Sequence, residues 1–275
     1  MIKKCDLYIR DPYIYKEEGV YYLYSSYKTE TDEFPSFVVY KSIDLLEFTE
    51  PKFIFKGTKD FWATKDFWAP EMHKYNGKYY LFASLKSEKH CRGTQIFVSD
   101  RPDGEFVPLT EKPITPNDWE CLDGTLWIED GKPYLVFCHE WLQIEDGTIC
   151  VMELSRDLVS AVGEPIVLFS ASQVKWPLPF CGERNYVTDG PFIIKNNDHL
   201  EMIWSSYCST GYAIGKCISK SVLGPWTHLE KPIYSDDGGH AMIFDMDGTK
   251  QMAFHKPNTF DGRERLVLVP YELND

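Results

Sequence analysis

The sequence predicts an all-β fold, a five-bladed β-propeller that forms a single domain over residues 1–275. Two observations predict it. Five short apolar and aromatic strands each follow a tight turn, and a short polar motif precedes each of these hairpins. The motifs stand 60, 52, 66 and 51 positions apart, and such a repeat, with four short strands in each unit, is typical of propeller blades. No segment keeps apolar residues at helical spacing over three turns.

The five hairpins are the clearest elements of the pattern. Their turns carry Gly, Asn or Asp, which accept the left-handed backbone that tight hairpins require. We expect turns at 17–19, 76–77, 129–131, 196–198 and 246–248. The strands that follow them are expected at 20–26, 78–84, 133–140, 199–206 and 250–256.

Each blade also needs outer strands. Third strands are predicted at 37–42, 94–100, 148–155 and 212–219, and fourth strands at 52–57, 164–169 and 231–236. A β-sandwich would also show strands at short intervals. The matched motif before every hairpin favours the propeller.

The composition excludes several classes of protein. Twenty-nine basic and 42 acidic residues give a net charge of −13, which repels phosphate backbones, so we expect no nucleic-acid partner. No apolar run is long enough to span a membrane, so we expect no membrane partner. Hydrophobic residues make up 43% of the chain, which excludes a disordered protein.

The N-terminus and the cysteines predict a compartment. The segment MIKKCDLYIRDP has no apolar stretch typical of a signal peptide. Eight scattered cysteines show no zinc-ligand spacing, and a chain of this length has no need of disulfides. We therefore expect free thiols and a cytoplasmic location.

The motifs place chemistry in one location. Inner strands of a propeller line its central channel, so matched residues of all blades form a ring around the axis. The expected ring is Asp11, Glu71, Asp123, Asp189 and His240. A single Asp beside Gly or Pro more often stabilises a turn. Five polar residues at matched positions favour a functional site, because like charges in one volume raise each other's pKa and destabilise the fold.

Carboxylates in different environments are the groups that hydrolyse glycosides. One remains ionised and activates water, while another keeps its proton for the leaving oxygen. Aromatic faces also bind sugar rings, and Trp68 and Trp141 stand near the motifs. Packing in the core is an equally good interpretation of either tryptophan.

These motifs resemble glycoside hydrolase family 43, which has a five-bladed propeller. The segments that carry the resemblance are RDP (10–12), FWAPEMHKYNGKYYLFAS (67–84), LDGTLWIEDGKPYLVF (122–137), TDGPFIIKNN (188–197) and GGHAMIF (238–244). The resemblance implies that Asp11 is the general base and that Asp123 tunes the pKa of the general acid. It implies inversion at the anomeric carbon. It also places His240 near the channel axis, where family members hold a Ca²⁺ or another ion.

One departure leaves the general acid open. The family places a Glu before Gly-Pro in the fourth blade, and this chain has Asp189 there. Asp189, Glu140 in CHEW and Glu183 in CGERN are three candidates. Arg184 and Arg265 are candidates for binding a sugar hydroxyl, as is Glu71.

The expected substrate is an oligosaccharide with terminal or side-chain pentose or furanose units. The resemblance is greatest to α-L-arabinofuranosidases, with β-xylosidases and galactofuranosidases as alternatives. A propeller lyase or fructosyl-transferring enzyme remains open, and so does a propeller that only binds carbohydrate. Binding propellers tend to repeat one motif identically, whereas the ring members here differ.

Overall fold

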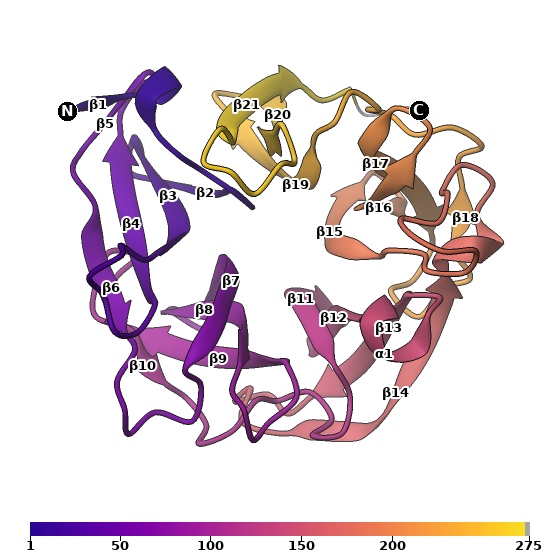
Figure 1. The fold of residues 1–275 in the computed structure, drawn as a ribbon, viewed down its shortest axis with the longest axis horizontal. Helices are drawn as coiled ribbons and strands as arrows, with labels where there is room; N and C mark the ends of the chain where they lie inside the picture. The colour runs from indigo at the N-terminus through magenta and orange to yellow at the C-terminus, as the bar shows by residue number, and fades with distance from the viewer. Residues whose placement is uncertain (273–275) are drawn as a thin grey trace.

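The computed structural model describes residues 1–272 and contains five antiparallel sheets arranged around a central channel (Figure 1). This confirms the five-bladed propeller. Blade one contains β2 (Tyr13–Glu17), β3 (Val20–Tyr27), β4 (Ser36–Ser42) and β6 (Lys52–Lys56). Blade two contains β7 (Lys65–Tyr75), β8 (Lys78–Lys86), β9 (Gly93–Ser99) and β10 (Val107–Pro108).

The remaining blades follow in chain order. Blade three contains β11 (Cys121–Glu129), β12 (Lys132–His139), β13 (Thr148–Leu154) and β14 (Ala161–Ser170), with the short helix α1 (Trp141–Ile144) after β12. A 3₁₀ turn (Ala171–Gln173) follows β14. Blade four contains β15 (Asp189–Asn196), β16 (His199–Cys208), β17 (Gly211–Ser219) and β18 (Thr227–His228). Blade five contains β19 (Gly239–Met246), β20 (Thr249–Lys256) and β21 (Arg265–Pro270).

All five predicted hairpins are present, and each has a two-residue turn. The flanking pairs are Glu17–Val20, Tyr75–Lys78, Glu129–Lys132, Asn196–His199 and Met246–Thr249. In four of the turns both central residues have positive φ, as at Asn76 (47°) and Gly77 (79°). That backbone twist matches the twist of the two strands, which explains why Gly, Asn and Asp predicted these turns.

The outer strands were predicted less well. The segment 231–236 is not a strand of blade four, and only an isolated bridge joins Tyr234 to Ile214. The fourth strand of that blade is the two-residue β18 instead. Pro232 lacks the N–H that a continuous ladder needs, and a short outer strand has little apolar surface to reveal it.

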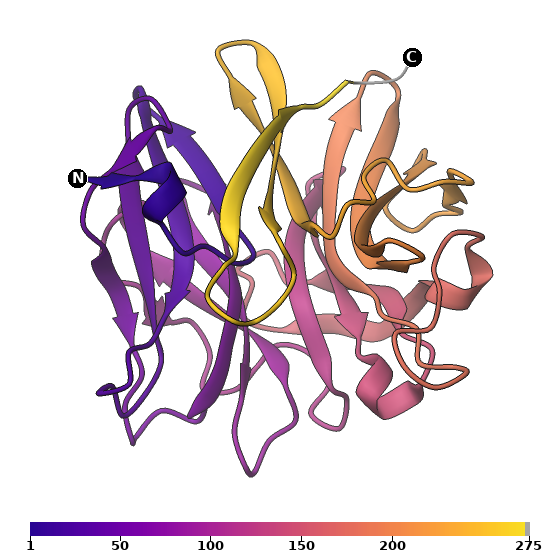
Figure 2. The ribbon, with the colours of Figure 1, turned by 45° about the horizontal axis from the view of Figure 1, so that its top comes forward.

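The N-terminal segment closes the ring. Strand β1 (Ile2–Lys3) pairs with β5 (Glu47–Phe48), and a 3₁₀ turn (Lys4–Asp6) follows β1. The chain then runs beside β21, where Tyr8 bridges Arg265 and the Ile9 N–H donates to the Glu264 carbonyl at 3.2 Å. Figure 2 shows this indigo segment next to the yellow blade. The contact brings Arg10 and Asp11 to the channel.

The core lies between neighbouring blades. Strands such as β8 and β12 are buried along almost their whole length, because a blade packs on a neighbour through each face. Three apolar clusters fill these interfaces, with Phe37, Phe137 and Trp204 fully buried. In the described chain no helix is long and apolar enough to cross a membrane.

Candidate active site

A cavity of about 650 Å³ lies at one end of the channel, and all five blades contribute to its wall. Candidate residues from the sequence that line it are Asp11, Trp68, Asp123, Glu140, Trp141, Asp189 and His240. Other lining residues include Tyr8, Arg10, Asp66, Phe180, Tyr207, Tyr212 and Phe260. The propeller therefore gathers segments that are far apart in the chain into one concave, partly apolar site.

A repeated backbone feature aims the ring residues into the channel. A residue in the left-handed region stands at or near the start of each inner strand, and these five residues are Asp11, Ala69, Asp123, Gly190 and His240, with φ between 44° and 56°. In blades two to five this residue belongs to a β-bulge, where two residues of the inner strand face one of the next strand. Such bulges turn side chains away from the regular alternation of a strand.

The bulges correct the expected ring in two blades. Ala69, and not Glu71, is the matched residue of blade two, and Gly190, and not Asp189, is that of blade four. The prediction matched the blades by the carboxylate in each motif. In the structure, the equivalent position of each blade is the residue with positive φ. Asp189 still lines the cavity from the preceding position.

His240 lies between two carboxylates. Its Nδ1 is 3.4 Å from Asp11 Oδ1 and 3.6 Å from Asp123 Oδ2. Burial opposes the charged imidazolium, but the charges of Asp11 and Asp123 prevail and raise the pKa of His240. The imidazolium thus provides the positive charge at the centre of an acidic ring.

Asp11 is held in its ionised form. Burial alone would raise its pKa, but the charges of His240 and then Arg10 bring the pKa below the ordinary value. The Asp11 N–H donates to His255 Nδ1 at 3.2 Å, so His255 is neutral and carries its proton on Nε2, which faces Asn258 Oδ1 at 3.2 Å. Burial also lowers the pKa of His255 to about 4. A carboxylate that remains ionised is suited to accept a proton from water.

Asp123 interacts through its charge with both Asp11 and Asp189. The Gly190 N–H donates to Asp123 Oδ2 at 3.0 Å, and the Asp123 N–H donates to Ser84 Oγ at 2.8 Å. Burial raises the pKa of Asp123 to about 6, against the attraction of His240 and with the charge of Asp11 adding to the rise.

The surroundings of Asp189 favour the protonated form of its carboxyl group. Burial and then the charge of Asp123 raise its pKa to about 7. The Tyr212 hydroxyl donates to Asp189 Oδ2 at 2.8 Å and limits this rise. The carboxyl groups of Asp123 and Asp189 interact, so they bind and release protons as a pair.

Glu140 occupies a different environment in the same cavity. Its carboxylate accepts a hydrogen bond from Arg92 Nη1, and Arg92 Nη2 reaches Asp66 Oδ2 at 3.0 Å. The Arg92 guanidinium also lies 4.1 Å from the Trp68 ring centroid. Burial raises the pKa of Glu140 to about 7, although Arg92 opposes this rise. Glu140 is thus part of a buried charge cluster that supports Trp68.

The structure places four predicted residues away from the cavity wall. Glu183 and Arg184 are exposed in the loop before β15. Arg265 donates from Nε to the Cys5 carbonyl at 2.8 Å and so joins the N-terminal segment to blade five. Glu71 is buried with its Oε2 3.2 Å from His73 Nε2, and it acts on His240 only through its charge.

The motifs in the sequence did not reveal Tyr212 and Phe260, which line the cavity, or Arg92, which pairs with Glu140 of the cavity wall. Arg92 and Tyr212 lie in or beside predicted strands, where nothing in their spacing distinguishes them from structural residues. Phe260 stands in a turn segment, NTFDGRE, and a large apolar residue among turn formers was the available signal.

The expected Ca²⁺ does not fit the residues around His240. Calcium takes six to eight oxygen ligands, whereas this position offers an imidazolium and two carboxylates. Among residues 1–272 no group of three or more His, Cys, Asp or Glu side chains is arranged to hold a metal ion. We derive no step through a metal.

The fold and the cavity define the chain as a propeller glycosidase, with carboxyl groups of contrasting pKa in one pocket. The sequence profile of glycosyl hydrolases family 43 matches residues 6–271, and the chain belongs to this family. This confirms the resemblance that the motifs indicated.

Individual relatives agree with this assignment. The chain is 40% identical in sequence to the endo-arabinase from Bacteroides thetaiotaomicron VPI-5482. The crystal structure of that protein matches this fold with a TM-score of 0.91, over 100% of this chain and 98% of that one. It is 23% identical to the extracellular exo-α-(1→5)-L-arabinofuranosidase ArbA of Cellvibrio japonicus (strain Ueda107), over 97% of this chain and 80% of that protein. A β-xylosidase/α-arabinofuranosidase from a compost metagenome, solved with xylotriose in a calcium-free form, has the same fold at 19% identity and a TM-score of 0.74.

The expectation of a cytoplasmic location was wrong, because the Cellvibrio relative is an extracellular enzyme. All eight cysteines are free thiols, and Cys121, Cys138, Cys150 and Cys217 are buried. A core of this size is stable without disulfides, so free thiols do not report the compartment.

Proposed function

We propose that the protein is an inverting glycosidase that releases α-L-arabinofuranosyl units from oligosaccharides, and that residues 1–275 form one catalytic unit. The observation that supports this most strongly is the contrast between two carboxyl groups in one cavity. The pKa of Asp11 is lowered, whereas that of Asp189 is raised to about 7. Near pH 6 the site thus holds a base and an acid together, as inversion requires.

The mechanism follows from these protonation states. Asp189 donates its proton to the glycosidic oxygen while the bond from that oxygen to the anomeric carbon breaks. A water attacks the opposite face of the carbon and gives its proton to Asp11. The sugar leaves with inverted configuration, and exchange with solvent restores both groups. The charge of Asp123 keeps Asp189 protonated until the leaving oxygen approaches.

Asp189 is a better candidate for the acid than Glu140. The guanidinium of Arg92 donates to Glu140, and such a partner favours a carboxylate that accepts hydrogen bonds. Asp189 faces a neutral hydroxyl instead. It also stands directly before Gly190 and Pro191, where the family pattern places its acid. We assign Glu140 to the binding of a sugar hydroxyl.

Leaving-group dependence tests the assignment. Asp189→Asn and Glu140→Gln are assayed on an arabino-oligosaccharide and on an aryl α-L-arabinofuranoside with a strongly acidic phenol. Asp189→Asn should lose far more activity on the oligosaccharide, because an activated phenol leaves without a proton. Glu140→Gln should lose similar activity on both. The reverse pattern would assign the acid to Glu140.

Substrate class and stereochemistry are tested in the same preparation. Aryl arabinofuranoside, xyloside and galactofuranoside are compared, and we expect the arabinofuranoside to have the highest kcat/KM. NMR of the first product should show the inverted anomer. A retained anomer would exclude Asp11 as a base for water.

A further inference from the structure

Phe260 is an exposed aromatic residue at the wall of the cavity. Its side chain is 71% exposed, yet it lines the same cavity as Asp11 and Asp189. Its φ of 56° is a left-handed value that bulky residues rarely adopt, because it strains the backbone. A loop that only connects β20 to β21 has no need of a large apolar side chain in this conformation.

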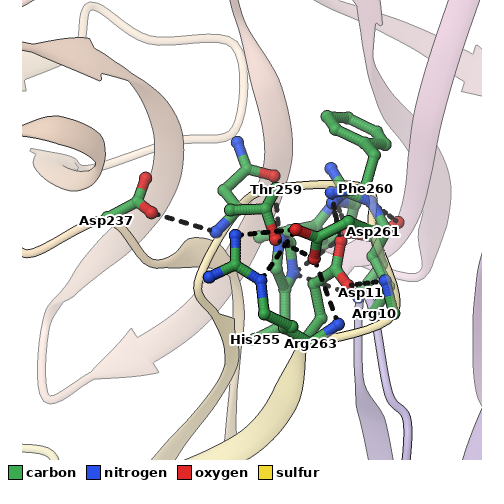
Figure 3. Close-up of polar contacts among 12 residues, drawn as sticks. Arg10, Asp11, Asp237, His255, Thr259, Phe260, Asp261 and Arg263 are labelled. Atoms are coloured by element: carbon green, nitrogen blue, oxygen red, sulfur yellow. Dashed lines mark hydrogen bonds and ion pairs between the residues drawn. The ribbon is translucent and has the colours of Figure 1, made fainter.

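The loop has a rigid foundation. Glu264, which is fully buried, accepts hydrogen bonds from the N–H groups of Phe260 and Gly262. Thr259 and Arg263 both donate to Asp261 at 2.7 Å. Figure 3 shows Thr259, Asp261 and Arg263 gathered with Arg10 and Asp11, with the Phe260 ring at the edge of the cluster. The position of the ring is therefore set before any ligand arrives.

One face of the ring is already covered. The Arg10 guanidinium lies 3.6 Å from the centroid of the Phe260 ring, and Arg10 Nη1 is 3.4 Å from Glu264 Oε1. Arg10 Nε also lies 3.8 Å from Asp11 Oδ2, so the ring stands one residue away from the base. The exposed part of the ring is available to the apolar C–H face of a sugar.

We propose that Phe260 is a specificity-determining residue that stacks on a sugar unit bound beside Asp11. The inference rests on the proposed function and adds a stacking position that the motifs did not include. Preorganisation by Glu264 and Arg10 keeps the entropy cost of the contact low. Stacking on one aromatic face contributes roughly three- to tenfold in affinity.

Substitutions at Phe260 separate stacking from simple bulk. We expect Phe260→Leu and Phe260→Ala to raise KM roughly three- to tenfold with arabino-oligosaccharides, while Phe260→Trp keeps KM within twofold. Ile43→Ala is the matched control, because Ile43 is 77% exposed and does not line the cavity, and its KM should not change. Equal KM values for the Leu and Trp variants would overturn the proposal.

A pH profile excludes an indirect effect through Arg10. If Phe260 only held Arg10 against Asp11, Phe260→Leu would move the acidic limb of kcat/KM and leave KM unchanged. That result would also overturn the proposal. Stacking predicts a higher KM with the acidic limb in place.

Calorimetry separates this inference from the proposed function. Arabino- and xylo-oligosaccharides are titrated into Asp189→Asn, which leaves Arg10, Asp11 and Phe260 intact, and into the same variant carrying Phe260→Leu. Weaker binding to the double variant supports stacking, and equal binding refutes the stacking alone. If neither protein binds any of these sugars, the proposed function fails together with the inference.

Discussion

Replacing Tyr212 with Phe should move the alkaline limb of the pH profile upward. The Tyr212 hydroxyl donates to Asp189 at 2.8 Å in a buried environment, and this bond favours the ionised carboxylate. A hydrogen bond to a charged group contributes about 1.5–3 kcal/mol. At about 1.4 kcal/mol for each pKa unit, its loss raises the pKa of Asp189 by roughly one to two units.

The alkaline limb of kcat/KM reports the acid of the free enzyme. With the pKa of Asp189 near 7, activity should fall above that pH in the unmodified protein and above pH 8 in Tyr212→Phe. The assay is kcat/KM of an arabino-oligosaccharide from pH 4 to 10. Tyr207→Phe is the control, because Tyr207 neighbours Tyr212 at 5.1 Å but its hydroxyl accepts from Asn258. An alkaline limb that stays in place or moves downward in Tyr212→Phe would refute the reasoning.

Three further variants test the charges of the protein. His240→Gln removes the imidazolium that favours ionised Asp11, so the acidic limb of kcat/KM should move to higher pH, and a pH titration of activity measures this. Arg92→Met removes the cation that pairs with Glu140 and Asp66 and that packs on the Trp68 ring. We expect KM for an oligosaccharide to rise at least tenfold. An unchanged KM would exclude Glu140 from sugar binding. Tyr271→Phe removes the hydroxyl that donates to buried Glu201 at 2.6 Å, and Glu201 also pairs with Lys216. The free energy of unfolding should fall by about 1.5–3 kcal/mol, which lowers Tm by roughly 3–10 °C in a calorimetric scan. Because the pKa of Glu201 is lowered in the folded protein, its contribution is present above the unfolded pKa and is lost as pH falls through the folded pKa.

The hairpins could be predicted because their signal is local. A two-residue turn needs a left-handed backbone, and residues that adopt it readily, such as Asn76 and Gly77, predict the turn from the local sequence. The outer strands carry a weaker signal. β18 has two residues, and the segment around Tyr234 looked more like a strand than it is. Short edge strands bury little, so their sequence is scarcely constrained.

The carboxyl groups that we propose as catalytic could be predicted in part, because the repeat places them in one channel. Their partners could not. Arg92 reaches Glu140 from the neighbouring blade, and Tyr212 on β17 reaches Asp189 on β15 across the same blade, so such pairs depend on the packing of whole sheets. Phe260 depends on a loop whose position is set by buried Glu264. Glu264 follows Phe260 by only four residues, but nothing in the local sequence shows that its side chain is buried and holds the loop.

The bulge in blade four explains why the sequence repeat predicted Asp189, and not Gly190, as the matched residue of that blade. A Cβ at Gly190 would lie 2.9 Å from His240 Cδ2, so the imidazole and any side chain at that position exclude each other. Gly190 also gives its N–H to Asp123. One glycine thus makes room for the cation of the ring and fixes the carboxylate that raises the pKa of Asp189. The acid that we propose, Asp189, is the residue before the bulge, so blade four supplies its carboxyl group one position out of register with blades one and three.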